Sequence, residues 1–222
     1  MNYLKLLSFL CCLSFLFPGC FEVREEVDMN RDGSGKFKLT INLSESKDQV
    51  KKYLTVEKVE GYELSKNKNV ESILKHVKYA MLNVKGMSNV ATTADFQNFI
   101  FTISSDFVNL DALNNAVTTV TKQLDYLYVP PIESKNYSYD AHQFNRYFDY
   151  PIDPKAYNEM PSMQRYVFES SHAISIFRFD RPIRSFSNKK AELSPSGKAI
   201  KLETSIGDLA RGTETLENTI SF

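Results

Sequence analysis

Few side chains in this sequence combine a reactive group with a meaningful spacing, and the clearest is a cysteine near the amino terminus. The chain has 222 residues and three cysteines, Cys11, Cys12 and Cys20. Gly19 directly precedes Cys20, and residues 6–17 form an apolar run broken only by two serines. Cysteine carries a nucleophilic thiol, and this one lies where an apolar leader ends at a small residue.

Residues 17–20 resemble the lipobox of bacterial lipoproteins, in which the cysteine thiol receives a diacylglycerol and the leader before it is removed. The match departs from the family at Phe17, where leucine is usual. The apolar run of 12 residues fits a signal peptide but not a membrane span, which needs about 20 residues. The resemblance implies that residues 1–19 are a signal peptide and that Cys20 is lipidated. An ordinary secretory leader with an incidental cysteine is the alternative.

The same resemblance implies a location in the cell envelope, because acyl chains on Cys20 would anchor the chain to a membrane. Phe21 follows the cysteine where an aspartate would be a retention signal in diderm lipoproteins. By that analogy we expect the outer membrane. Whether the domain faces the periplasm or the exterior stays open. After Cys20 the chain has no further cysteine, so a hydrophobic core rather than disulfides must stabilise it.

The remaining residues with metal-binding or catalytic chemistry show no matching spacing. Residues 28–33 match the opening of a calcium loop, but the twelfth position, which needs a bidentate carboxylate, is Leu39. His76, His142 and His172 lie far apart in the sequence, without the spacing of a zinc site or a hydrolase motif. We therefore expect no metal, no cofactor and no catalytic residues. An envelope hydrolase with a dispersed active site is the alternative.

Composition excludes two further classes of protein. Lysine plus arginine total 27 and aspartate plus glutamate total 27, so the chain is neither a strongly basic nucleic-acid binder nor an acidic tail protein. Hydrophobic residues reach 42%, enough for a packed core. A basic cluster lies within residues 178–190 near three phenylalanines. We interpret it as a solvated loop, with contact to lipid headgroups as the alternative.

The elements that must position any site follow from hydrophobic periodicity. Residues 21–29 and 37–43 alternate around a turn-rich segment and predict a β-hairpin. Helices are predicted over residues 46–54, 69–84 and 110–124, with a shorter one over 163–169, and Gly86 is expected to end the second with a left-handed cap. The predicted strands outside the hairpin cover residues 90–95, 99–107, 137–141, 144–150, 173–179, 199–204 and 216–222, with a bulge near 142–143 and a further strand ending near 193.

This pattern predicts an α+β fold, with an antiparallel sheet and two or three amphipathic helices packed on one face. Pro130 and Pro131 suggest a linker between two halves. Residues 20–129 would form a hairpin, helix, strand and helix half. Residues 130–222 would add a tyrosine-rich segment and carboxy-terminal antiparallel strands, forming one continuous globular domain with the first half.

The tyrosine-rich segment is the candidate contact surface. Residues 126–166 hold eight of the 12 tyrosines, and tyrosine combines a large apolar ring with a polar tip. We expect Tyr137, Tyr139, Tyr147 and Tyr150 to bind a ligand, either a glycan or a protein. The alternative is that these rings only cover the edge of the sheet.

Several turns and caps carry a resemblance to a wider group of proteins. They are the hairpin of residues 21–43 and the segments 86–90, 109–114 and 193–198. Together they resemble uncharacterised lipoproteins of Bacteroidetes, and they are distantly similar to the LppM-like lipoprotein domain, in which a hairpin follows the lipid-bearing cysteine. The resemblance implies a lipid-anchored, non-catalytic binding or assembly protein of the envelope. Its partner would be an envelope protein or glycan, not a nucleic acid, and the ligand and oligomeric state stay open.

Overall fold

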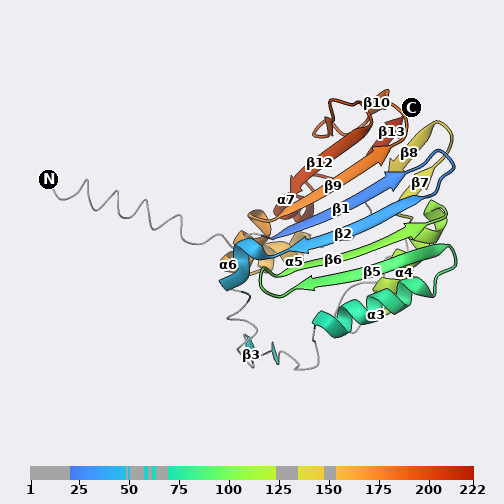
Figure 1. The fold of residues 1–222 in the computed structure, drawn as a ribbon. Helices are drawn as coiled ribbons and strands as arrows, with labels where there is room; N and C mark the ends of the chain where they lie inside the picture. Colours follow the sequence, from blue (N-terminus) through green and yellow to red (C-terminus); the bar gives the residue numbers. More distant parts are fainter. Residues whose placement is uncertain are drawn as a thin grey trace.

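The protein is built around one long sheet of seven strands (Figure 1). The computed structural model describes residues 21–48, 50, 58–59, 62–63, 70–123, 135–147 and 154–222. The strand order is β11-β12-β9-β1-β2-β6-β5. Neighbouring strands are antiparallel except β1 and β9, which are parallel. The strands are β11 (Glu192–Leu193), β12 (Ala199–Ser205), β9 (His172–Phe179), β1 (Glu22–Met29), β2 (Gly35–Asn42), β6 (Ile100–Phe107) and β5 (Met87–Asp95).

A second sheet of four strands and two long helices complete the core, so the predicted α+β class is confirmed. The second sheet has the order β10-β13-β8-β7. Its strands are β7 (Tyr137–Tyr139), β8 (Gln143–Arg146), β10 (Ser185–Phe186) and β13 (Asn218–Ser221). The helices are α3 (Val70–Leu82) and α4 (Leu110–Gln123). A separate pair, β3 (Lys58–Val59) and β4 (Tyr62–Glu63), forms a two-stranded ladder.

The predicted hairpin is confirmed as β1 and β2, which pair from Glu22 with Asn42 to Met29 with Gly35. Alternation decides which side chains enter the core, because successive residues of a strand point to opposite faces. Val27, Met29 and Phe37 are buried on the inner face. The turn contains Asp32, which accepts hydrogen bonds from the backbone and hydroxyl groups of Ser34. These are the contacts of a tight turn.

Helices α3 and α4 follow the predicted apolar stripes and lie against the sheet and against each other. Leu74, Val77 and Met81 are buried on α3. Gly86, the predicted end of this helix, has a φ of 93°, and a side chain there would approach Val108 to 2.7 Å. Helix α4 begins behind Asn109, whose side-chain oxygen accepts a hydrogen bond from the backbone of Ala112 at 2.9 Å.

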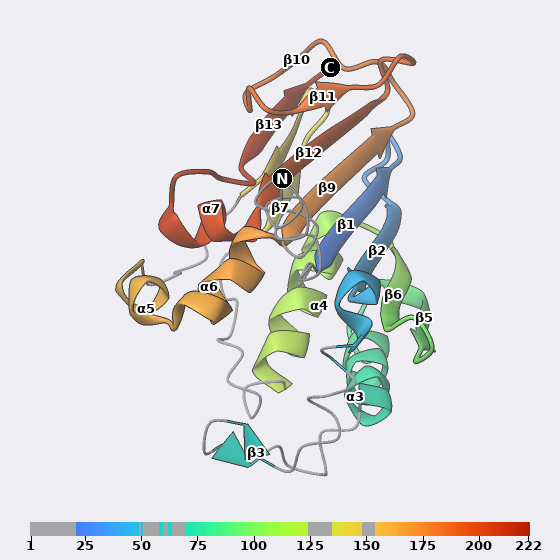
Figure 2. The same cartoon turned by 90° about the vertical axis from the view of Figure 1, so that its left-hand side faces the viewer.

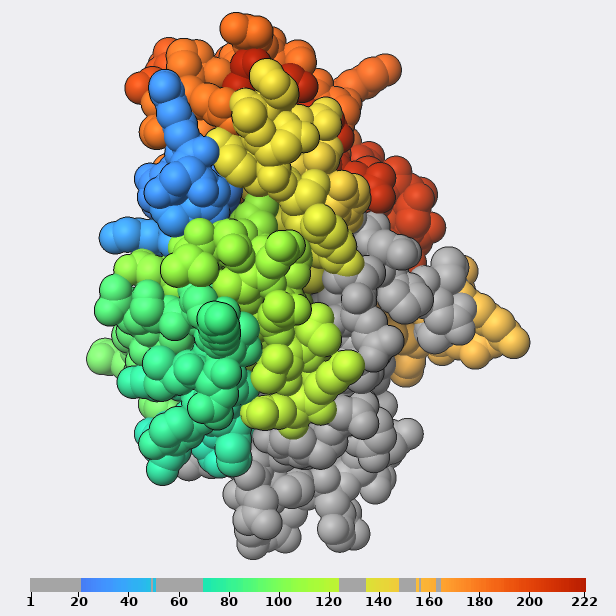
Figure 3. Space-filling model, turned by 90° about the vertical axis from the view of Figure 1, so that its right-hand side faces the viewer, coloured from blue at the N-terminus to red at the C-terminus, as the bar shows by residue number. Residues whose placement is uncertain are grey.

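The turn within the tyrosine-rich segment differs from the prediction. The bulge expected near His142 and Gln143 is a turn, and β7 and β8 form a hairpin around it. The carboxylate of Asp140 accepts hydrogen bonds from the backbone of both residues, at 2.7 and 2.9 Å. The predicted offset between the two alternating segments is therefore present, but its cause is a turn held by Asp140, at which the chain reverses direction. In Figure 3 this hairpin (yellow) lies beside α4 (yellow-green).

Three short helices cover the end of the sheet at which β9 begins (Figures 1 and 2). They are α5 (Pro154–Glu159), α6 (Ser162–Glu169) and α7 (Ile206–Arg211). Helix α6 was predicted, whereas α5 and α7 were not. At the predicted helix 46–54, a short 3-10 turn, Ser44–Ser46, comes first, and the described residues Lys47, Asp48 and Val50 that follow it are α-helical, as predicted. The other residues of this predicted helix lie outside the described part of the chain.

Candidate functional site

A carboxylate lies in the middle of the inner face of the large sheet. Glu25 of β1 pairs with Leu39 of β2 on one side and with Ser175 of β9 on the other. All three positions point toward the helices and the second sheet, in the same alternation as Val27. Glu25 is 8% exposed. Burying a carboxylate this far is costly unless partners compensate its charge, so its neighbours decide whether the fold tolerates it.

Arg146 of β8 supplies that compensation from the opposite layer. Its Nη2 and Nε atoms donate to Oε2 of Glu25 at 3.1 and 3.3 Å, and the arginine is 4% exposed. The hydroxyl of Ser175 donates to the same oxygen at 3.3 Å, and the Tyr137 hydroxyl donates to Oε1. The third guanidinium nitrogen donates to the backbone carbonyl of Tyr147. A salt bridge with this many hydrogen bonds can be buried, because the remaining lone pairs and protons are also satisfied.

Helix α4 fixes the strand that carries Tyr137. The side-chain oxygen of Asn114 accepts hydrogen bonds from the backbone of Asn136 and Tyr137, at 2.9 and 3.0 Å, and its amide donates to the carbonyl of Tyr137 at 2.9 Å. The Arg146 guanidinium lies 5.1 Å from the centre of the Tyr137 ring, within cation–π range. The ion pair is thus held by three layers: the large sheet, the second sheet and α4.

Two cavities lie on either side of this ion pair, and Glu25, Leu39 and Arg146 line both. The first, of about 210 Å³, lies between the sheet and the two long helices. Its helical wall consists of Val77, Met81, Leu113, Ala116, Val117, Val120 and Thr121. The second, of about 260 Å³, extends toward α7. Its further apolar wall consists of Val23, Ala173, Ile174, Ile206, Leu209 and Leu216. Apolar cavities of this size can take up hydrophobic molecules.

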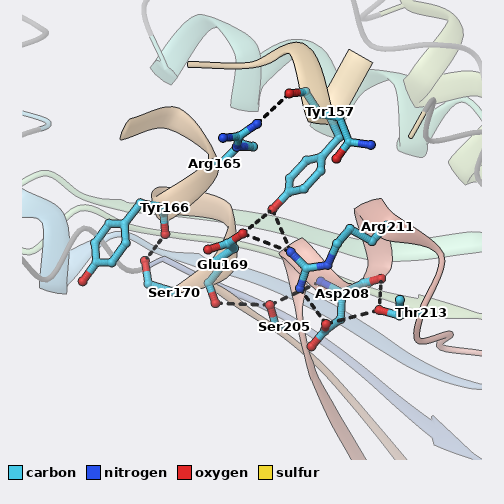
Figure 4. A network of polar contacts seen from close by, with 10 residues as sticks. Tyr157, Arg165, Tyr166, Glu169, Ser170, Ser205, Asp208, Arg211 and Thr213 are labelled. Carbon is cyan, nitrogen blue, oxygen red and sulfur yellow. Dashed lines mark hydrogen bonds and ion pairs between the residues drawn. The ribbon is translucent and has the colours of Figure 1, made fainter. Parts of the chain in front are cut away.

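A second group of charged side chains forms a polar network at the end of the sheet (Figure 4). Arg211 of α7 donates to Glu169 of α6 at 3.0 Å and to Asp208 at 2.8 Å. Tyr157 of α5 is buried, and its hydroxyl donates to Glu169 at 3.3 Å. Burial raises the pKa of Tyr157, and the hydrogen bond from Arg211 lowers the pKa of Asp208. At Gly207 a Cβ would lie 2.9 Å from the Glu169 side chain, so α7 packs tightly on α6. These contacts hold the three short helices together.

The outer face of the large sheet is polar and carries exposed ion pairs. Glu26 lies between Lys38 and Arg178, with N–O distances of 3.1 and 2.7 Å, and Asp28 also contacts Arg178 at 3.0 Å. Burial opposes the charge of Glu26, but the hydrogen bonds from Arg178 and Lys38 outweigh it and lower its pKa. Arg178 of the predicted basic cluster is therefore paired across the sheet. Arg181, from the same cluster, lies 3.9 Å from the Phe222 ring.

The histidines are not brought together in the described residues. His76, His142 and His172 are all exposed, and His172 lies 3.4 Å from Glu203 on the outer face. Within these residues no group of three or more histidine, cysteine, aspartate and glutamate side chains is placed to hold a metal ion. The polar contacts around Glu25 all converge on its carboxylate, so the side chains of Arg146, Tyr137 and Ser175 fix its position.

The predicted site residues fall in different places. Cys20 and Tyr150 lie outside the described residues. Tyr137 is 3% exposed and lines the first cavity instead of the outer surface. Its hydroxyl donates a hydrogen bond to the buried carboxylate of Glu25. Tyr139 is half-buried beside Arg181, and Tyr147 is 40% exposed. Of the three described rings, Tyr147 is thus exposed, Tyr139 half-buried and Tyr137 buried. Across the described part of the chain, no helix is long and apolar enough to cross a membrane.

Comparison with known proteins finds a distant likeness among solved structures only. A scan against models of protein families finds no match, and neither does a search of curated proteins. Among solved structures, the chain is similar to the folded domain of LppM from Mycobacterium tuberculosis, determined by NMR, with a TM-score of 0.42 and 9% sequence identity. The likeness covers 90% of this chain and 88% of that one.

Proposed function

We propose that this protein is a lipid-anchored lipoprotein of the cell envelope that binds an apolar ligand without acting on it chemically. The proposal of a ligand rests on the pair of cavities that meet at Glu25 and Arg146. Both walls are predominantly aliphatic, and a few polar groups among apolar ones are typical of small-molecule sites. The anchor is supported by Gly19 and Cys20 behind the apolar leader. Phe21 after the cysteine supports the outer membrane.

The charges in the cavity wall define the chemical class of the ligand. Glu25 and Arg146 neutralise each other, and the hydroxyls of Tyr137 and Ser175 donate further hydrogen bonds to the carboxylate. A ligand group with a net charge would therefore meet no uncompensated charge there, and its desolvation would oppose binding. The ligand portion inside the cavities is accordingly uncharged, such as a hydrocarbon chain.

Binding of an uncharged fluorescent dye, N-phenyl-1-naphthylamine, tests this function. The domain without its leader is titrated with the dye, and folding is checked by circular dichroism. A fatty alcohol should displace the dye at lower concentration than the fatty acid of equal length, because the carboxylate costs desolvation. Equal displacement by the two, or no dye binding, would contradict the proposed ligand class.

A substitution that fills the first cavity locates the binding. Ala116 is 1% exposed and lines that cavity, so Ala116→Leu places three further carbon atoms in it. The variant should bind less dye and should be at least as stable as the parent, because it fills a void. The control is Asn115→Leu, which adds an apolar side chain to the exposed face of the same helix. Equal loss of binding in both variants would place the dye elsewhere.

A protein or glycan partner at the tyrosine-rich segment stays part of the proposal. Tyr147 supports it, because its ring is exposed and its hydroxyl lies 2.9 Å from that of Ser138. Such a ring can be replaced with little loss of stability. Tyr147→Ala should therefore leave the unfolding transition unchanged while weakening capture of the partner in a whole-cell crosslinking experiment. Unchanged crosslinking would argue against this surface.

A further inference from the structure

One end of the large sheet is defined by a row of residues that pair from strand to strand. The row runs across five strands and continues onto β5, through Ser205, His172, Glu22, Asn42, Ile100 and Asp95. We call this the anchor end, since β1 begins there two residues after Cys20. Figure 2 looks onto it, with α5 and α6 at the front.

The chain enters the domain at this end without a linker. The backbone N–H of Phe21 donates to the Ser171 hydroxyl at 3.0 Å, and its carbonyl accepts from the backbone of His172 at 2.9 Å. The Phe21 ring packs edge-on against Phe168 of α6, with centroids 6.2 Å apart. Consecutive Cα atoms are about 3.8 Å apart, so a lipid on Cys20 would be held within one residue of the folded domain.

We propose that the anchor end lies against the membrane surface and that Phe96 and Tyr166 contact its headgroup layer. This inference rests on the proposed lipidation of Cys20. Phe96 directly follows the last residue of β5 and is 41% exposed, and Tyr166 of α6 is 48% exposed. Exposed apolar side chains also occur elsewhere, for example Val108. The attachment point selects this end, because the other end of the sheet is a full strand length away from Cys20.

Both rings are carried by well-supported parts of the fold. Phe96 packs edge-on against Phe101 of β6, with centroids 5.7 Å apart. Helix α6, which carries Tyr166, is held to α7 by the Glu169–Arg211 ion pair shown in Figure 4. Phenylalanine and tyrosine at the level of the headgroups gain from burying their rings, and tyrosine keeps its hydroxyl in contact with water.

The charges around the anchor end do not favour an electrostatic contact. Lys155 and Glu159 form an exposed pair on α5, and Lys47 and Asp48 are adjacent in the sequence. Because positive and negative groups alternate there, attraction to anionic lipid would be weak. The contact should therefore depend on the aromatic rings and be insensitive to salt, which screens only the charged contribution.

The test uses the full chain, purified in its acylated form and reconstituted into vesicles of phosphatidylethanolamine and phosphatidylglycerol. Single cysteines for a bimane probe are introduced by Gln97→Cys at the anchor end and Ser196→Cys at the opposite end, both at exposed positions. Part of the lipid is brominated in the upper part of its acyl chains, so that it quenches nearby probes. Bimane at position 97 should lose fluorescence, whereas bimane at position 196 should not. Neither result should change between low and high salt.

A second comparison tests the two rings. Combining Phe96→Ser with Tyr166→Ser should reduce quenching at position 97, whereas the control Tyr147→Ser should not. All three side chains are exposed, so the variants should fold. Equal quenching at positions 97 and 196, or no effect of the double variant, would overturn the inference.

Flotation of the vesicles separates this inference from the proposed anchor. If Cys20→Ser stops the protein from floating while both probes are quenched equally, the anchor stands and only the orientation is wrong. If Cys20→Ser floats like the parent, the lipid anchor is wrong and this inference falls with it.

Discussion

Replacing Arg146 by methionine should strongly destabilise the protein. The substitution keeps an unbranched side chain of similar length but removes the guanidinium. Glu25 would lose two donors, which lie 3.1 and 3.3 Å from Oε2, and would keep only the hydroxyls of Tyr137 and Ser175. Breaking a buried pair by removing one partner costs about 3–5 kcal/mol. Because small domains are typically stable by about 5–15 kcal/mol, this is a large fraction of the total.

The double variant Glu25→Leu/Arg146→Met shows whether the orphaned charge is the cause. It removes the carboxylate together with its partner, so its cost should be smaller than the sum of the two single variants by about 2–3 kcal/mol. Some loss should remain, because the hydroxyls of Tyr137 and Ser175 then lack their acceptor.

Urea unfolding followed by far-ultraviolet circular dichroism measures these differences, since the chain has no tryptophan to report by fluorescence. The matched control is Arg184→Met, at an exposed position, which should change stability by no more than about 0.5 kcal/mol. If Arg146→Met behaves like this control, the pair is not the buried interaction inferred from the distances. Strictly additive single variants would lead to the same conclusion.

Three further predictions concern the anchor and the short helices. Cys20→Ser should abolish labelling by a fatty-acid probe in cells, and undiminished labelling would argue against the lipobox. The pKa of Asp208 is lowered by the hydrogen bond from Arg211. The ionised carboxylate should therefore stabilise the fold fully at pH values above the unfolded pKa of about 3.9. This stabilisation should be lost as the pH falls through the lower pKa of the folded state. The stability difference between parent and Asp208→Asn, measured by urea unfolding across pH, should therefore shrink below about pH 3.9, and a difference that grew there would contradict this sign. Gly207→Ala should lower the melting temperature, because the new Cβ would lie 2.9 Å from the Glu169 side chain and 3.0 Å from the Glu169 Cα. An unchanged melting temperature would show that α6 can move away.

Local sequence patterns predict those helices and hairpins that are determined by residues close together in the chain. The β1–β2 hairpin follows from alternation around a turn, and α4 follows from an apolar stripe behind the cap Asn109. What the sequence does not contain is the partner of each strand. The parallel pairing of β1 with β9 joins residues 150 positions apart, such as Glu22 and His172, and no local pattern selects it.

The central ion pair is absent from the sequence-based predictions, although the sequence contains two signals for it. Val23, Val27 and Met29 alternate on the apolar phase of the first strand, and Glu25 occupies the gap in that series. Arg146 likewise shares its phase with Phe144. A charge on the buried phase of a strand requires a partner of opposite sign. Two such positions on different strands, one acidic and one basic, are therefore candidates for pairing on the sequence alone.

The ion pair also accounts for the cavities beside it. A guanidinium and a carboxylate must keep their hydrogen-bonding geometry, so they cannot adjust to the aliphatic side chains around them as two hydrophobic residues would. The space left over lies on both sides of Glu25 and Arg146, where the two cavities are found. An apolar replacement that restored stability would also change the walls of both cavities. Substitutions at these two positions should therefore affect the proposed ligand binding as well as stability, because the same two side chains line both cavities.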